Sequence, residues 1–268
     1  MSPDPSSRLE ARGLTLGYDG RAVVEDLTLA VPDGRITTVI GPNGCGKSTL
    51  LRGLGRLLRP MAGTVTLDGV PLSRLSTRRV AQLLAVLPQS HTAPEGLTVA
   101  DLVSRGRHPR QRWYQQFSRA DENAVRRALE ATGVAEFADT PVDELSGGQS
   151  QRAWISLTLV QDTDILLLDE PTTYLDLAHQ VEILELVHRL NRELGRTVVM
   201  VLHDISLAAR FSDHLVAMDA GRVVAQGSPG EVVTEELLER VFGLRARIVP
   251  EPTSGRPHVI PLSRTAVG

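Results

Sequence analysis

The glycine-rich octapeptide at residues 41–48, GPNGCGKS, constrains the fold more than any other segment of the chain. It follows a β-branched run at residues 35–40 and precedes a stretch with helical periodicity at residues 47–58. The pattern G-x-x-x-x-G-K-[ST] between a buried strand and a helix is typical of loops that hold phosphate groups. We therefore expect a strand–loop–helix unit within an α/β fold.

The residue types in this loop fit a nucleoside triphosphate. Glycines leave the backbone N–H groups free to turn inward toward the α- and β-phosphates. Lys47, the one lysine among 29 lysines and arginines, places a positive charge on the β- and γ-phosphates. The Ser48 hydroxyl suits Mg²⁺, and Cys45 stands at a variable position of the pattern. The expected nucleotide contacts here are Gly41, Pro42, Asn43, Gly44, Cys45, Gly46, Lys47, Ser48 and Thr49.

An apolar run at residues 165–168 ends in two acids, Asp169 and Glu170. A buried strand that ends in two carboxylates is costly unless cations or hydrogen-bond donors meet them. Beside a phosphate loop, Asp169 is expected to hold Mg²⁺ with Ser48. Glu170 is expected to be the general base that polarises the attacking water.

Strand and helix patterns alternate along the chain, which predicts a mostly parallel α/β core. Antiparallel strands with a turn at residues 18–20 are expected before the phosphate loop. Ser118 is a plausible N-cap for the helix predicted at residues 119–132. The predicted divisions are a flexible tail at residues 1–8, one domain at 9–243 with a helical subdomain inserted at about 90–160, and a tail at 244–268. The predicted helices are residues 47–58, 99–105, 119–132, 147–160 and 177–194, and the predicted strands include 35–40, 63–67, 85–87, 164–168 and 197–202.

Charge and composition exclude several classes of protein. The net charge of −3 gives no indication of a nucleic-acid partner. The single cysteine excludes an internal disulfide, and no apolar run reaches the roughly 18 residues that span a bilayer. We expect a soluble, cytoplasmic protein whose membrane part, if it serves a membrane process, comes from another chain. Guanine recognition by N-K-x-D is disfavoured because the only lysine already lies in the phosphate loop.

A further motif, LSGGQ at residues 145–149 followed by Ser150, Gln151 and Arg152, resembles the signature of ABC transporter ATPases. The resemblance covers about residues 9–243 and implies a P-loop NTPase (RecA-like) core that binds and hydrolyses ATP with Mg²⁺. Ser150 replaces a frequent arginine and leaves Ser-Gly-Gly-Gln intact. The resemblance also implies roles for single residues. Tyr18 would stack on adenine, the Q-loop Gln89 would contact Mg²⁺, and the H-loop His203 would contact the γ-phosphate. Residues 174–176 match the D-loop.

The resemblance also implies a dimer. Ser146, Gly147, Gly148 and Gln149 offer a hydroxyl and backbone amides at the start of a helix, which suits a second contact to the nucleotide. In the family, each ATP lies between the phosphate loop of one subunit and the signature of the other. The chain has one of each, so two copies, or this chain and a similar one, are expected to pack head to tail.

The segment at residues 97–109 resembles the matching part of importers for ferric siderophores, haem and cobalamin. This implies permease subunits in the membrane, an indirectly associated periplasmic or lipoprotein substrate-binding protein, and a peripheral location at the cytoplasmic face of the cell membrane. Ferric siderophore import is favoured, with haem or cobalamin next. The alternative for Arg105, Arg107, His108 and Arg110 is a solvated basic face. An exporter motor and a soluble non-transport ATPase are the rival classes.

Overall fold

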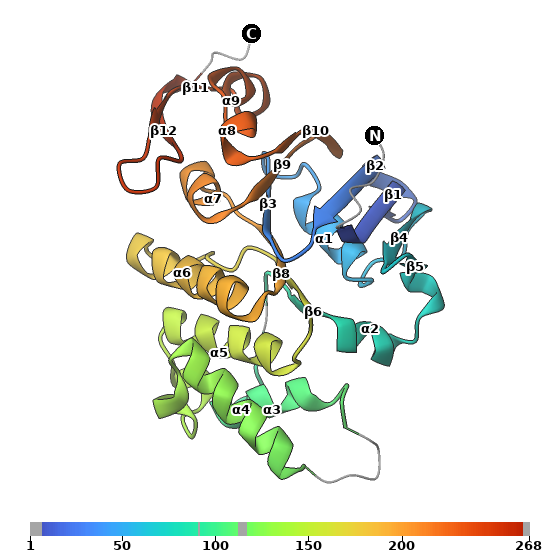
Figure 1. Cartoon of the computed structure of the whole chain (residues 1–268), viewed down its shortest axis with the longest axis vertical. Coiled ribbons are helices and arrows are strands. Elements are labelled where there is room, and N and C mark those ends of the chain that lie inside the picture. The colour runs from blue at the N-terminus through green and yellow to red at the C-terminus, as the bar shows by residue number, and fades with distance from the viewer. Residues whose placement is uncertain (1–6, 91, 112–116, 265–268) are drawn as a thin grey trace.

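A computed structural model describes residues 7–90, 92–111 and 117–264 (Figure 1). Its largest sheet has the strand order β10-β9-β3-β8-β7-β6, and all neighbours are parallel except β10, which runs antiparallel to β9. This confirms the expected α/β class. The strands are β3 Ile36–Ile40, β6 Leu84–Leu87, β7 Ile165–Leu168, β8 Thr197–Val201, β9 His214–Asp219 and β10 Arg222–Gly227.

Side chains on this sheet alternate between two apolar cores, as the two-residue period of a strand requires. On β7, Leu166 and Leu168 pack with the helices of one face, whereas Ile165 and Leu167 pack with α1 and the N-terminal strands on the other. All four are at most 3% exposed. The continuous apolar run therefore reflects burial on both faces, which is typical of parallel strands.

An antiparallel sheet with the order β2-β1-β4-β5 covers one side of α1. The turn between β1 and β2 has left-handed backbone at Asp19 and Gly20, as the sequence predicts. Helix α1, Lys47–Leu54, is shorter than expected, because the chain turns out of it after Gly55 and Arg56 adopts a φ of 58°. The strands are β1 Ser7–Tyr18, β2 Arg21–Pro32, β4 Ala62–Leu67 and β5 Val70–Pro71.

The helical subdomain contains α3, α4 and α5 and lies beyond the β6 edge of the large sheet, away from β9 and β10 (Figure 1). Ser118 caps α4 in a capping box with Asp121, so the predicted helix start is confirmed. Helices α4, α5 and α6 have the predicted bounds. The helices are α2 Thr77–Leu83, α3 Val99–Ser104, α4 Arg119–Thr132, α5 Gly147–Val160, α6 Leu177–Leu194 and α7 Ile205–Phe211, with 3₁₀ turns at Leu72–Arg74, Arg105–Arg107, Ala135–Phe137 and Val142–Glu144.

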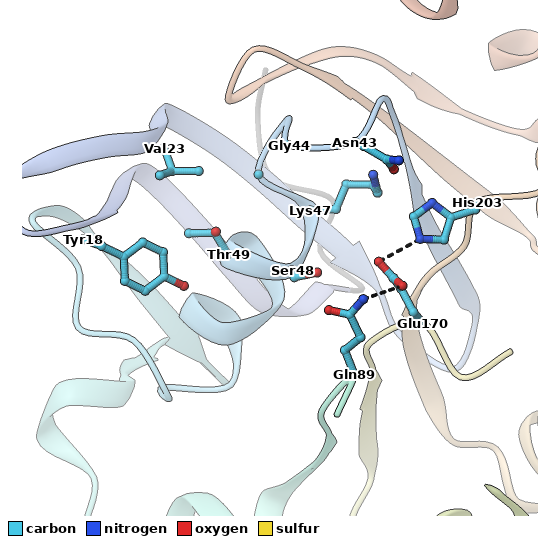
Figure 2. A pocket seen from close by; sticks show the side chains of 11 residues that line it. Tyr18, Val23, Asn43, Gly44, Lys47, Ser48, Thr49, Gln89, Glu170 and His203 are labelled. Atoms are coloured by element: carbon cyan, nitrogen blue, oxygen red, sulfur yellow. Dashed lines mark hydrogen bonds and ion pairs between the residues drawn. The ribbon is translucent and has the colours of Figure 1, made fainter. Parts of the chain in front are cut away.

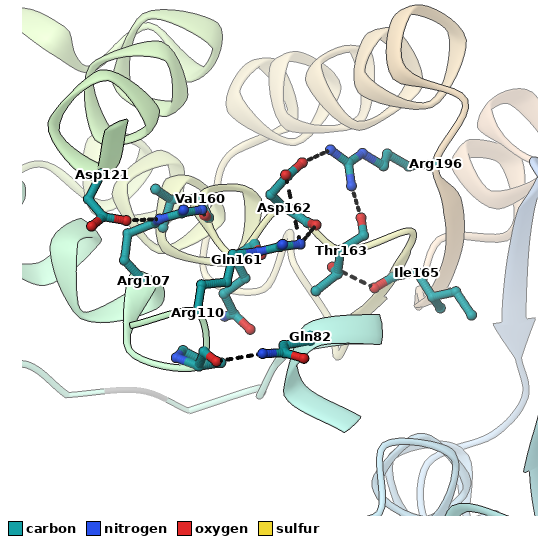
Figure 3. Close-up of polar contacts among 11 residues, drawn as sticks. Gln82, Arg107, Arg110, Asp121, Val160, Gln161, Asp162, Thr163, Ile165 and Arg196 are labelled. Atoms are coloured by element: carbon teal, nitrogen blue, oxygen red, sulfur yellow. Dashed lines mark hydrogen bonds and ion pairs between the residues drawn. The ribbon is translucent and has the colours of Figure 1, made fainter. Parts of the chain in front are cut away.

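A polar network joins the helical subdomain to the large sheet (Figure 3). Arg107 pairs with Asp121 at 2.8 Å and donates to the Val160 carbonyl. Arg110 donates to the carbonyls of Gln161 and Asp162. The Arg107 side chain is only 13% exposed, so the solvated-face interpretation is wrong for this residue. Arg107 therefore ties the first turn of α4 to the C-terminal end of α5.

Asp162 connects this network to the core, because its carboxylate also pairs with Arg196, just before β8. The Arg196 guanidinium holds the pKa of Asp162 below its ordinary value, against the opposing effect of burial. The helical subdomain is thus tied by ionic contacts at the point where the chain returns to the sheet.

The C-terminal region differs from the expected tail at residues 244–268. Strands β11 (Leu244–Pro250) and β12 (Pro257–Arg264) form an antiparallel hairpin that packs on α7 and α9. Arg256 donates to the Ser212 carbonyl, and the Val259 N–H donates to Ser206 Oγ at 3.0 Å. The short helices before it are α8 Pro229–Val232 and α9 Glu235–Phe242.

The expected flexible tail at residues 1–8 is shorter than predicted at its C-terminal end, because strand β1 begins at Ser7. Residues 1–6 and 265–268 lie outside the described residues. Within residues 7–90, 92–111 and 117–264, every helix is too short or too polar to cross a bilayer.

Candidate functional site

The predicted site residues gather at one edge of the large sheet. The phosphate loop follows β3, Gln89 follows β6, Asp169 and Glu170 follow β7, and His203 follows β8. In parallel sheets the carboxyl ends of neighbouring strands lie side by side, and ligands bind at that edge. Segments far apart in the sequence therefore contribute to one cavity.

The backbone of the phosphate loop passes very close to its neighbours. A Cβ on Gly41 would lie 2.3 Å from the Met218 carbonyl oxygen and 2.7 Å from Cys45 Sγ, so only glycine fits at position 41. Cys45 is 5% exposed and belongs to the apolar core, where burial raises the pKa of its thiol. Gly41 and Cys45 thus support the phosphate loop on the side that packs against the core.

The two polar side chains at the start of α1 have internal partners. Lys47 is 6% exposed, and its Nζ donates to the carbonyls of Gly41 and Pro42 at 2.8 and 2.9 Å. Ser48 Oγ donates to Asp169 Oδ1 at 2.8 Å. The ammonium group lies beside the loop amides, and the hydroxyl–carboxylate pair is a set of oxygen donors that Mg²⁺ prefers. These residues fit a triphosphate with its magnesium ion.

Glu170 is the centre of the second half of the cavity (Figure 2). Its carboxylate accepts hydrogen bonds from Gln89 Nε2 at 2.7 Å and from Thr173 Oγ1 at 2.9 Å, and it pairs with His203 Nε2 at 2.8 Å. Glu170 also has left-handed backbone, with φ of 52°. Strained backbone of this kind clusters at functional sites.

The two carboxyls at the end of β7 have opposite pKa shifts. Burial raises the pKa of Asp169, and the nearby Glu170 charge adds to the rise although Ser48 opposes it. Burial acts in the same direction on Glu170, but hydrogen bonds from His203, Thr173 and Gln89 outweigh it and hold the Glu170 pKa below its ordinary value. Glu170 therefore stays ionised at neutral pH, as a general base must.

A cavity of about 480 Å³ connects the phosphate loop with Gln89, Glu170 and His203 and has the size of a small-molecule site. Tyr18 lies at one end, 42% exposed, with its hydroxyl accepting from Arg52 at 3.2 Å (Figure 2). Glu170 and His203 lie at the other. The cavity is lined by Tyr18, Val23, Asn43, Gly44, Gly46, Lys47, Ser48, Thr49, Gln89, Glu170 and His203.

The signature residues lie elsewhere, at the start of α5. Ser146 Oγ accepts from the Gln149 N–H, and Gln149 Oε1 accepts from the Ser146 N–H, which forms a capping box. Gly147 borders a second cavity of about 450 Å³ that also reaches Gln89 and Glu170. The structure therefore brings the phosphate loop and the acid pair together but leaves the signature outside their cavity.

Three residues of the site were not predicted from the sequence. Thr173 holds Glu170, Arg52 holds the Tyr18 hydroxyl, and Val23 lines the cavity. Thr173 lies three residues after Glu170, in the turn that follows β7, but a lone threonine at that spacing is no distinctive signal. Arg52 lies on the exposed side of α1, where arginine is common.

Comparison with known proteins identifies the family. The family model described as ABC transporter matches residues 24–173, which is more than half of the chain. The chain belongs to the ABC transporter family.

Relatives of this ABC protein match it along nearly its whole length. The ferric enterobactin transport ATP-binding protein FepC of Escherichia coli (strain K12) is 51% identical over 97% of this chain and 96% of its own. The iron(3+)-hydroxamate import ATP-binding protein FhuC of Bacillus subtilis (strain 168) is 50% identical over 93% of each chain.

Solved structures confirm the fold. One chain of a metal-chelate type ABC transporter in an inward-facing conformation superposes with a TM-score of 0.83 at 26% identity, over 96% of this chain and 98% of that one. The dimeric bacterial ABC transporter cassette MJ0796 gives a TM-score of 0.73 at 27% identity, over 82% and 98%. The P-loop core, the antiparallel region and the helical subdomain are therefore features that this chain shares with ABC cassettes.

Proposed function

We propose that this chain is the ATP-hydrolysing subunit of an importer that takes up an iron–siderophore complex through a separate permease. Hydrolysis of ATP is supported by one observation above the others: the ionised Glu170 is held by Gln89, Thr173 and His203 in the cavity that contains Lys47 and Ser48. A carboxylate fixed beside a phosphate loop is placed to accept a proton from an attacking water.

The residues of this cavity have distinct roles in the proposal. The loop amides and Lys47 bind the phosphates, and Tyr18 stacks on the adenine. Ser48 and Asp169 hold Mg²⁺, with Gln89 close to it; when bound, this ion neutralises charge that develops on the phosphates. His203 contacts the γ-phosphate and orients Glu170, to which it is already paired at 2.8 Å.

The position of the signature supports a head-to-tail dimer. Ser146 and Gly147 lie outside the phosphate cavity of their own chain, so these groups are available to the nucleotide of a second subunit. The dimeric cassette with the same fold gives the precedent. A second copy of this chain is the simplest partner, and a similar chain is the alternative.

The iron–siderophore cargo is inferred from relatives, because the cargo does not contact the ATPase subunit of an importer. Proteins named for ferric enterobactin and iron(3+)-hydroxamate are about half identical to the chain. A hemin import ATP-binding protein of Rhodococcus jostii (strain RHA1) is 39% identical, so haem is the second candidate. On this proposal the chain acts at the cytoplasmic face of the membrane, with permease subunits and, indirectly, a substrate-binding protein.

Two measurements test the proposal. The chain should co-purify with a polytopic permease encoded beside it, and the complex should hydrolyse ATP only with magnesium present. A deletion strain should fail to grow when a ferric siderophore is the iron source and recover with the wild-type gene, but not with Glu170→Gln. Growth rescued only by haem would move the cargo to the second candidate, and absence of ATP hydrolysis would refute the function.

A further inference from the structure

The signature helix α5 touches the first turn of α6 at one unusually close contact. A Cβ on Gly148 would lie 2.8 Å from Cδ2 of His179 and 3.4 Å from its Cγ. Real Cβ atoms are not found this close to a ring, so His179 as it lies requires glycine at 148. Gly148 is buried under this ring, whereas its neighbour Gly147 is exposed.

The ring of His179, 46% exposed, also contacts Asp176. Asp176 Oδ1 lies 2.8 Å from His179 Nδ1 and accepts from the His179 backbone N–H at 2.9 Å, so the same carboxylate caps α6 and orients the ring. These contacts hold the pKa of Asp176 below its ordinary value. Asp176 lies in the D-loop, directly ahead of α6.

Contacts on both sides of this pair join the same two helices. Arg152 on α5 pairs with Glu182 on α6, one turn further along each helix. At the start of α5, a Cβ on Gly147 would meet Leu175 Cδ2 of the D-loop at 3.6 Å, an ordinary contact distance. The first turns of α5 and α6 thus pack as one block, with the His179 ring as its central spacer.

We propose that His179 is a positioning residue for the signature: its ring, resting on Gly148, sets the first turn of α5 at a fixed place relative to the D-loop. The two motifs then meet the second subunit as one rigid unit. The proposal rests on the proposed role of the signature at the partner's nucleotide. It explains the glycine at position 148 by a contact within the same chain: the residue must leave room for the His179 ring, rather than for a phosphate.

A double-mutant cycle tests this assignment. Gly148→Ala, His179→Ala and the double variant are compared with wild type as full chains in complex with the permease, measuring kcat and KM for ATP. Each single change should lower kcat about tenfold, because the signature is displaced. Nucleotide affinity of the isolated chain should not change, because the phosphate cavity is untouched. The double variant should be no slower than the slower single variant.

Multiplied losses, about a hundredfold in the double variant, would overturn the proposal, because they mean that Gly148 and His179 act separately. A wild-type kcat in His179→Ala would also overturn it. Gly147→Ala is the matched control: its Cβ has room, so its effect on kcat should multiply with that of His179→Ala. If His179→Ala masks Gly147→Ala as well, the contact is not specific to Gly148 and the proposal fails.

Thermal unfolding of the same four chains separates this proposal from the proposed function. Gly148→Ala should lower the melting temperature in the wild-type background and do so much less in the His179→Ala background. Equal shifts in both backgrounds would refute the contact even if no chain hydrolysed ATP. A wild-type complex without ATP hydrolysis but with coupled melting temperatures would instead refute the function alone.

Discussion

The phosphate cavity and the signature are both polar sites at the start of a helix, but they differ in how their groups are engaged. At the cavity, four strand ends bring polar groups together: Gln89 and His203 contact Glu170, Ser48 contacts Asp169, and Lys47 bonds to the carbonyls of the phosphate loop. At the signature, the side chains of Ser146 and Gln149 bond to each other's backbone, and both Ser146 and Gly147 are exposed. On the proposed function, one chain therefore supplies the phosphate loop and the acid pair for one nucleotide, while its signature serves the nucleotide of a second subunit.

This difference has an energetic consequence. A nucleotide that enters the cavity must replace existing bonds, such as those from Lys47 Nζ to two backbone carbonyls, with bonds of at least equal strength. Phosphate oxygens can do so because they are charged acceptors. The signature residues Ser146, Gly147, Gly148 and Gln149 have no charged side chain, and on the proposed function their contribution depends on a second subunit. Changes in the cavity should therefore act on one chain alone, and changes in the signature only on the dimer.

The largest effect is expected for Glu170→Gln, which removes the general base and leaves the shape of the side chain. Turnover should fall by about 10²–10⁴-fold, the usual contribution of a positioned base. Binding of ATP to the isolated chain should persist, as measured with a fluorescent analogue. Turnover at the wild-type rate would show that the hydrogen-bonded carboxylate is not the base. The cavity of one chain would then lack the general base that the proposal assigns to it.

Lys47→Ala should act one step earlier, on binding itself. Loss of the charged donor should weaken ATP binding to the isolated chain by about 10- to 100-fold, the range for hydrogen bonds to charged groups. Titration of the purified chain with ATP measures this. Lys47→Arg keeps the charge and serves as the control for it. Unchanged affinity in Lys47→Ala would mean that the ammonium group does not meet the phosphates.

Ser146→Ala should leave nucleotide binding by the isolated chain unchanged and lower the turnover of the complex by about tenfold, because one hydroxyl is lost from the dimer site. The chain offers a matched control in Ser118, which caps α4 with an equivalent capping box. Both variants lose a helix cap worth about 1 kcal/mol. If Ser118→Ala slows turnover equally, the effect of Ser146→Ala comes from lost helix stability. The contrast between the phosphate cavity and a signature that acts on a second subunit would then be unsupported.

The smallest effect is expected for Tyr18→Ala, at the open end of the cavity. Because the ring is 42% exposed, loss of stacking should weaken ATP binding by only about fivefold, at the low end of base–aromatic stacking. Tyr18→Phe keeps the ring and loses only the bond with Arg52, so its affinity should stay near wild type. An equal loss in both variants would assign the effect to the hydroxyl instead.

The core of this fold could be predicted from sequence because its signals are local. Buried strands have apolar runs, helices α4 and α6 have strong periodicity, and the cap at Ser118 marks a helix start that the structure confirms. The ends of elements that depend on single backbone angles were missed. Helix α1 ends early at a left-handed Arg56, and the prolines near residues 250–257 concealed the hairpin of β11 and β12.

The site was predictable to the same extent. Motif positions located Lys47, Gln89, Glu170 and His203, because their spacing from strand ends is visible in the sequence. Which of them touch could not be read from spacing, since Gln89, Glu170 and His203 meet only through the strand order of the sheet. The contact of Arg107 with Asp121 depends on packing between elements, so this residue, which looks solvent-facing in the sequence, proves to be an internal tie, whereas Arg105, His108 and Arg110 are exposed.

The solitary lysine gives the molecule an unusual chemical handle. Apart from the α-amino group, the only primary amine of this chain is the Lys47 ammonium, enclosed at 6% exposure within the phosphate loop. An acylating reagent that neutralises amines thus has one internal target, and its rate of attack reports whether that loop is shielded. Mass spectrometry of acylated protein, with and without nucleotide, would read occupancy at a single atom without any engineered label.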